Sequence, residues 1–246
     1  MANGPRSAPS AGRLLAEALW RMAGTPRAFW PPALVCTAAL AIAKFLVLAG
    51  GAASGLSALV AAVYVLLLHH WIQQGLIEDP KARTATPPWS FAGFAAGYCV
   101  LVVVVSVVLF LFLAPDVFGG TLTVNVLLMS TVSLAAAMAL GALAVGGALL
   151  FLPASIVDLP WNPGDAWRAA AGARGTLLVL ALLSTLVSLL GPALSVLLGL
   201  AQAGSGWLPA ALQVLSLLLD IAAVFILAHG ITRLFLAVTG RQPAEA

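Results

Sequence analysis

The 246-residue chain has very little charge. Only 8% of its residues are Asp, Glu, Lys or Arg, whereas an average soluble domain has about 25%. Apolar residues make up 62% of the chain. A soluble protein of this size could not cover its surface with so few charges. The composition therefore excludes a soluble enzyme, a nucleic-acid-binding protein and a secreted disulfide scaffold, and indicates that the lipid bilayer surrounds most of the chain.

Cysteine and catalytic motifs are scarce as well. Cys36 and Cys99 each lie within an apolar stretch and match no C-x-x-C or Cys/His spacing, so we interpret both as small apolar residues. The sequence has no H-E-x-x-H metalloprotease motif, no G-x-S-x-G nucleophile elbow, no P-loop and no Gly-rich dinucleotide fingerprint. We therefore predict no catalytic residue, no cofactor and no metal site, and a protein that is not an enzyme.

Long apolar runs are abundant. A membrane-spanning helix needs about 20 mostly apolar residues, and six runs meet that length. These runs are Pro32–Ala53, Leu56–Ile77, Phe91–Ala114, a run from Thr123 to beyond Leu150, Thr176–Leu200, and a run from Trp207 towards Leu236. The fourth and sixth runs exceed the thickness of a bilayer, so they should tilt or extend into the cytoplasmic interface. The sequence thus predicts an all-α, polytopic bundle of six transmembrane helices.

The basic residues orient this bundle. With six spans both termini lie on one side, and placing them inside puts ten of the eleven basic residues there. The ten are Arg6, Arg13, Arg21, Arg27, Lys81, Arg83, Arg168, Arg174, Arg233 and Arg241. We therefore predict a multi-pass protein of the bacterial inner membrane. Residues 1–30 form a cytoplasmic tail, residues 31–238 the transmembrane domain, and residues 239–246 a second cytoplasmic tail.

An amphipathic segment, Ser10 to Gly24, precedes the first span. Its apolar face comprises Leu14, Leu15, Ala18, Leu19 and Met22. Arg13, Glu17 and Arg21 are spaced as a ladder of charges on the other side. We expect a helix that lies in the cytoplasmic interface, either as an anchor for topology or as an element that recognises lipid or a partner. The expected partners are the bilayer, and anionic lipids or a membrane protein; no nucleic acid is expected.

Two charged residues lie deep within predicted spans. Lys44 is in the first span and Asp220 in the sixth, at depths that a long lysine side chain could bridge. A charge near the bilayer centre is costly unless something offsets it. We hypothesise that Lys44 and Asp220 pair and tie the two helices together, with a proton or substrate relay as the alternative.

Polar residues also gather near the cytoplasmic ends of two spans. His229 and Arg233 are four residues apart and share a helical face. Together with His70 and Gln73 they form a hypothetical polar pocket; the alternative is that the histidines lie at the interface without a specific role.

The fifth span is interrupted by Gly191 and Pro192. Proline removes a backbone hydrogen bond and tends to kink a helix. Close helix packing and a gating hinge are the two interpretations of this pair. After the fourth span, Asn162 and Asp165 are spaced as a capping pair with Pro163 at the first helical position, which predicts a helix start there.

One segment of the sequence is similar to a segment found in a known group of proteins. It consists of Leu152-Pro153-Ala154-Ser155-Ile156-Val157-Asp158, then Asp165-Ala166-Trp167-Arg168, then Gly175 before the fifth span. The segment and the overall layout resemble a broad group of uncharacterised bacterial six-helix membrane proteins. That group includes relatives of the membrane domain attached to some glycerophosphodiester phosphodiesterases. The resemblance implies about six helices and no assigned activity, and it carries over no catalytic residue.

These observations predict a non-enzymatic integral membrane protein that acts as an interaction, assembly or lipid-associated component. The alternative is a transporter or channel subunit that uses the polar site at Lys44 and Asp220.

Overall fold

The computed structural model describes residues 9–24, 26–48, 54–76, 89, 91–97, 104, 108, 146–157, 159–201 and 207–240. The helices are α1 (Ala11–Gly24), α2 (Pro26–Leu48), α3 (Ser54–Leu76), η3 (Gly146–Leu150), α6 (Phe151–Ile156), α7 (Pro163–Ala169), η4 (Ala170–Gly172), α8 (Arg174–Ala201) and α9 (Trp207–Thr239). Within these ranges there is no β-strand, which confirms the predicted all-α class.

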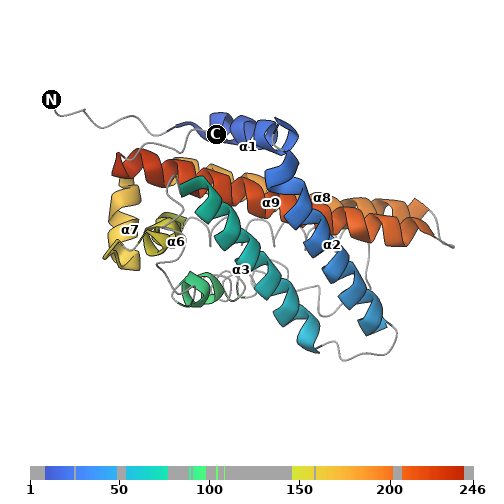
Figure 1. The fold of residues 1–246 in the computed structure, drawn as a ribbon. Coiled ribbons are helices and arrows are strands. Elements are labelled where there is room, and N and C mark those ends of the chain that lie inside the picture. The colour runs from blue at the N-terminus through green and yellow to red at the C-terminus, as the bar shows by residue number, and fades with distance from the viewer. Residues whose placement is uncertain are drawn as a thin grey trace.

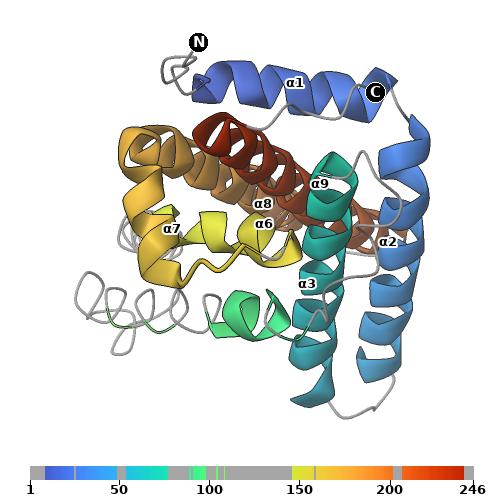
Figure 2. The same ribbon diagram turned by 60° about the vertical axis from the view of Figure 1, so that its left-hand side comes forward.

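Helix α9 is the centre of the fold. It has 33 residues and is therefore roughly 50 Å long at the usual rise per residue. Helix α8 runs beside it, and α1, α2 and α3 pack on it from other directions (Figures 1 and 2). A Cβ atom at Gly230 would lie 2.6 Å from Cδ1 of Leu180, so the α8–α9 contact depends on the missing side chain. The helix ends at Gly240, whose φ of 70° suits glycine.

The predicted amphipathic helix is confirmed as α1. The backbone N–H of Arg13 donates a hydrogen bond to the Ser10 hydroxyl at 3.4 Å, as expected of an N-cap. Only a narrow seam of this helix, formed by Ala11, Leu14 and Ala18, is buried against the bundle. Helix α1 lies across α9, and α2 then turns away beside α3 (Figure 2).

Helices α2, α3, α8 and α9 cover most of the first, second, fifth and sixth predicted spans. Of the described helices, one stretch, Ala211–Thr239, is long and apolar enough by itself to cross a membrane. A second candidate arises if Pro163–Gly172 and Arg174–Ser184, which meet at an angle of 102°, are one broken span. Six spans with both termini inside stay a prediction.

Helix α2 begins six residues before the predicted first span. It continues through Pro31 and Pro32, each of which removes one hydrogen bond within the helix. Phe29 and Ala33 are almost fully buried on either side of these prolines. The burial of these flanking residues therefore stabilises the first turns of α2, which a pair of prolines alone would not favour.

The end of the predicted fourth span is not one continuous α-helix. Residues 146–150 form the 3₁₀ segment η3, and α6 follows as a separate short helix, with both largely buried. A Cβ atom at Gly147 would lie 2.7 Å from Cε3 of Trp167, so glycine lets this segment approach α7 closely. The rest of the fourth run, up to residue 145, and most of the third run lie outside the described residues.

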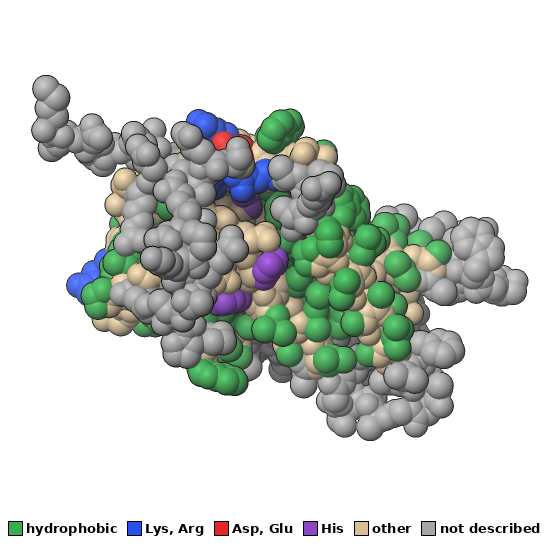
Figure 3. Space-filling model, in the orientation of Figure 1, with side chains coloured by type: hydrophobic (Ala, Val, Ile, Leu, Met, Phe, Trp, Pro, Cys, Tyr) green, Lys and Arg blue, Asp and Glu red, His purple; other side chains and the backbone are tan. Residues whose placement is uncertain are grey.

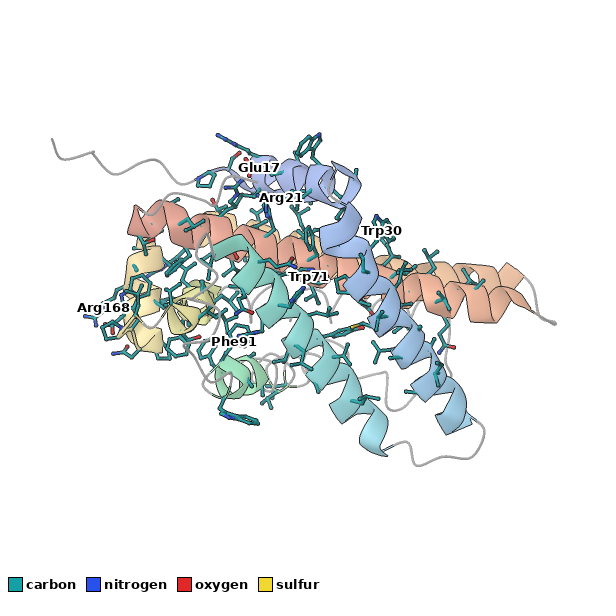
Figure 4. All side chains as sticks on the ribbon, in the orientation of Figure 1. Glu17, Arg21, Trp30, Trp71, Phe91 and Arg168 are labelled. Atoms are coloured by element: carbon teal, nitrogen blue, oxygen red, sulfur yellow. The ribbon has the colours of Figure 1, made fainter. Side chains whose placement is uncertain are left out.

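Large apolar side chains are exposed along the bundle. In Figure 3 they gather on one part of the visible face, while the charged side chains lie near α1 and at the edge of the molecule where Figure 4 labels Arg168. The exposed residues include Leu34, Val35, Ile42, Leu59, Leu66, Leu186 and Leu190. A contiguous apolar surface is unusual for a soluble monomer and is typical of a surface that contacts lipid or another protein.

Candidate functional site

A cluster of charged side chains forms where α1 crosses the C-terminal half of α9. Glu17 of α1 is its centre, and Figure 4 shows it beside Arg21 at this junction. Oε1 of Glu17 accepts a hydrogen bond of 2.9 Å from Nε of Arg13. Oε2 of Glu17 faces Nε of Arg233 at 3.4 Å and Nε2 of His229 at 3.7 Å. We call these five residues the Glu17 cluster.

Aromatic side chains pack against the His229 end of the cluster. The His229 ring stacks on Phe225 with a centroid distance of 6.4 Å. Phe225 contacts the rings of Phe29 and Trp71 edge-on, each at 5.1 Å. Residues from α2, α3 and α9 therefore fix the ring of His229, whose side chain is only 6% exposed. Trp71 is itself buried in this core.

The electrostatics of α1 reflect its partners on α9. Burial is the largest single influence on Glu17 and raises its pKa, but the hydrogen bond from Arg13 and the charge of Arg233 outweigh it, so the pKa lies below its usual value. Burial and the positive charge of Arg233 lower the pKa of Arg21. Both pKa values are lowered, which means that the charged form of Glu17 is favoured here, whereas the charged form of Arg21 is disfavoured, first by burial and then by the charge of Arg233.

No family model, curated protein or solved structure matches the chain. The interpretation of the Glu17 cluster therefore depends on its own geometry.

Two residues of the predicted cytoplasmic pocket lie in the Glu17 cluster. His229 and Arg233 meet at Glu17. His70 is exposed on α3 and shares a hydrogen bond of 2.9 Å with Gln74, while Gln73 is half-buried in the same turn. The sequence missed Glu17, which we placed in a surface ladder with Arg13 and Arg21. The only available signal was that Glu17 is the sole acidic residue of the amphipathic segment.

The deep acidic residue, Asp220, has a partner that we did not predict. Oδ2 of Asp220 accepts a hydrogen bond of 3.2 Å from the hydroxyl of Tyr64 on α3. Lys44 lies on α2, but its side chain is outside the described residues, so the Lys44–Asp220 pair stays a hypothesis. A tyrosine within an apolar run was the signal that could have suggested this contact.

Gly191 and Pro192 fall within α8, whose helical backbone continues through both. Across the described part of the chain, no group of three or more His, Cys, Asp or Glu side chains could hold a metal ion.

The predicted helix start at Asn162 is confirmed. The Asn162 side chain accepts from the Asp165 N–H at 2.9 Å, and Asp165 accepts from the Asn162 N–H at 3.0 Å. This reciprocal capping box also binds Arg168, whose guanidinium donates to Asp165 at 2.6 Å. Its contacts lie within one turn and are exposed, so it serves α7 alone.

Proposed function

We propose that this chain is a non-enzymatic, multi-pass protein of the bacterial inner membrane that acts as an interaction, assembly or lipid-associated component. The main observation that supports the proposal is the way in which α1 packs on the bundle. One face of α1 is held on α9 by the Glu17 cluster, while Trp20 is 73% exposed and Leu19 is 51% exposed on its outer side. A helix with exposed Trp and Leu near Arg side chains is typical of one that lies in the membrane interface.

The exposed apolar side chains of α2, α3 and α8 support the same proposal. In water this surface would be unfavourable, whereas lipid tails would cover it at no cost. The proposed topology is six spans with both termini in the cytoplasm, as the distribution of basic residues predicts. The resemblance of residues 152–175 to bacterial six-helix membrane proteins supports the number of helices only. Under this topology the Glu17 cluster lies at the cytoplasmic surface.

Reporter fusions test this topology. Alkaline phosphatase, which is active only outside the cytoplasm, is fused after Ala52, Phe118 or Gly204 in one set, and after Thr84, Asn162 or Ala246 in the other. We expect activity in the first set only. Activity in the second set, or its absence from the first, would contradict the six-span proposal.

A transporter or channel subunit is the second candidate, because Tyr64 and Asp220 form a polar contact between α3 and α9. The test uses Lys44→Cys, Tyr64→Cys and Asp220→Cys in a chain whose Cys36 and Cys99 are replaced by serine. In permeabilised cells, a membrane-impermeant maleimide should label Arg168→Cys as a positive control, because the Arg168 side chain is 77% exposed. Labelling at positions 44, 64 and 220 would favour transport, and protection at all three would favour the interaction protein.

A further inference from the structure

Aromatic contacts mark one level of the bundle where α2, α3 and α9 meet. Phe29 of α2 contacts the rings of both Trp71 and Phe225, with centroid distances of 5.8 and 5.1 Å. His69, which lies just before Trp71 on α3, contacts Phe91 edge-on at 4.9 Å. Because two residues rise only about 3 Å along a helix, these contacts lie at nearly the same height on α3. We call this height the Phe225 level.

Two exposed tryptophans adjoin the Phe225 level. Trp30 follows Phe29 directly, and Trp89 lies shortly before Phe91 in the sequence. Trp30 is 42% exposed and Trp89 is 79% exposed, whereas Trp71 is only 4% exposed. In the view of Figure 4, Trp30 and Phe91 lie on opposite sides of Trp71. Exposed indole rings at one height favour an interface between lipid and water, because the ring is apolar and its N–H forms hydrogen bonds.

The surface changes in character across the Phe225 level. On the side where α2 ends and α3 begins, large apolar residues are exposed, among them Leu34, Val35, Ile42, Leu59 and Leu66. On the other side the side chains of Arg13 and Arg168 are 74% and 77% exposed. Arg168 belongs to that side because Trp161, just before α7, contacts Phe235 of α9. Exposed tryptophans between an apolar and a charged surface are typical of a membrane boundary.

The lengths of the helices on the apolar side of this level match a bilayer. From Trp207, where α9 begins, to Phe225 is about 27 Å, and from Phe29 to Leu48, where α2 ends, is about 28 Å. The hydrocarbon layer of a bilayer is about 30 Å thick. Beyond Phe225, α9 is enclosed by other helices. The residues there with at most 2% exposure are Ile226, Ala228, Ile231, Thr232, Leu234 and Phe235.

We propose that the Phe225 level is the boundary between the hydrocarbon and the cytoplasmic headgroup layer, and that Trp30 and Trp89 contact phospholipid headgroups there. On this placement only Trp207–Phe225 of α9 crosses the hydrocarbon, and its C-terminal part lies within a protein core outside it. The Glu17 cluster, which meets α9 at His229 and Arg233, then lies about 6–12 Å beyond the boundary. This inference rests on the proposed location of the chain in a membrane.

Two positions on α8 provide a sharp test of this boundary. Leu180 packs against Gly230, so Val179 lies about 8 Å to the cytoplasmic side of the Phe225 level. Leu190, further along α8, lies about 8 Å to the other side. Both side chains are apolar and exposed, Val179 at 41% and Leu190 at 47%. Apolar character alone therefore predicts lipid contact at both, whereas the proposed boundary predicts it only at Leu190.

The experiment measures the accessibility of spin labels on Val179→Cys and Leu190→Cys, with Cys36 and Cys99 replaced by serine. The full-length protein is placed in vesicles of phosphatidylcholine and phosphatidylglycerol. Oxygen, which is soluble in lipid, and a nickel complex, which is soluble in water, are the two collision partners. We expect the oxygen-to-nickel ratio to be at least about threefold higher at position 190 than at position 179. Preferential oxygen access at both positions would overturn the boundary, and nickel access at both would overturn the membrane location itself.

Tryptophan fluorescence tests the contact with headgroups. Phospholipids brominated near the headgroup end of their chains should quench the emission that is lost in Trp30→Phe and in Trp89→Phe. Trp71→Phe is the matched control, because Trp71 lies at the same level but is 4% exposed, so the emission lost there should not be quenched. If Trp71→Phe does not fold, the spin labels decide, because they replace only exposed side chains.

Quenching of Trp30 and Trp89 by aqueous iodide but not by brominated lipid would overturn the headgroup contact and would indicate a surface for water or a protein partner. That result leaves the reporter fusions unaffected. Failed fusions with the expected label accessibility would instead contradict the six-span topology and retain the boundary, so the two failures are distinguishable.

Discussion

Two acidic residues organise arginines in this protein, and they do so in different ways. Asp165 binds Asn162 and Arg168, and all three lie within the first turns of α7. Glu17 binds Arg13 on its own helix, but it also faces His229 and Arg233 more than two hundred residues later in the chain. The first arrangement defines where one helix begins, whereas the second holds one helix on another.

The two arrangements differ in how deeply the partner side chains are buried, as well as in how far apart the partners lie along the chain. The partners of Asp165 are exposed, so water and salt weaken each charge pair. His229 is buried on a layer of aromatic rings, so its contact with Glu17 lies in a less polar environment. We therefore expect changes at the Glu17 cluster to affect the tertiary structure, and changes at Asp165 to affect α7 alone.

The largest effect should come from separating α8 and α9. In Gly230→Val the new side chain would collide with Leu180 of α8, which is fully buried. We expect a loss of about 1–3 kcal/mol in the free energy of unfolding, measured by thermal unfolding in detergent. Gly175→Ala on α8 is the control, since its Cβ would meet no atom within 4 Å. Equal stability of the two variants would contradict the close α8–α9 contact.

Removing the charge of Glu17 should have the next largest effect. Breaking a buried ion pair costs about 3–5 kcal/mol and breaking an exposed one about 0–1 kcal/mol. The Glu17 side chain is 29% exposed, so for Glu17→Gln we expect about 1–2 kcal/mol. Hydrogen exchange over residues 11–24 should become faster. Asp165→Asn should leave that exchange unchanged, and an equal increase in both variants would contradict a specific role for Glu17.

Acidification should reproduce part of this effect. The folded pKa of Glu17 lies below its ordinary value of 4.5, so its stabilising contribution is present above pH 4.5 and is lost as the pH falls through the folded value. The hydrogen bond from Asn162, the largest cause, and Arg168 lower the pKa of Asp165 below 3.8, so the cap of α7 should weaken only below pH 3.8. Hydrogen exchange against pH should show α1 loosening at acid pH, and unchanged exchange of α1 throughout the acid range would contradict a stabilising role of Glu17.

The smallest effect should follow from Asn162→Ala. This change removes the acceptor for the N–H of Asp165, and loss of an N-cap typically costs about 1 kcal/mol. Faster hydrogen exchange should appear in α7 and not in α1. Ser155, whose hydroxyl donates to the Leu152 carbonyl inside α6, offers a comparison: Ser155→Ala should leave the exchange of α7 unchanged. Faster exchange in α1 would show that α7 and the Glu17 cluster are coupled.

Local features were predictable because their causes are local. The capping box of α7 follows from the spacing of Asn162, Pro163 and Asp165, and α1 follows from its apolar periodicity and from Ser10. The apolar run from Pro32 did not indicate that α2 would begin six residues earlier, at Pro26, because the burial of Phe29 and Ala33 is a tertiary effect. In the same way, Gly146 and Gly147 gave no indication that η3 would pack against Trp167.

By itself the sequence determined the all-α class, the amphipathic pattern of α1 and the low charge content, since each depends on composition or short-range spacing. Only the tertiary structure decided which charges meet. Helical periodicity places Glu17 on one side of α1, but the angle at which α1 crosses α9 brings it to His229 and Arg233. In the same way, the packing of α3 on α9 gives Asp220 the hydroxyl of Tyr64. Such contacts depend on how helices cross, and no pattern along one helix contains that angle.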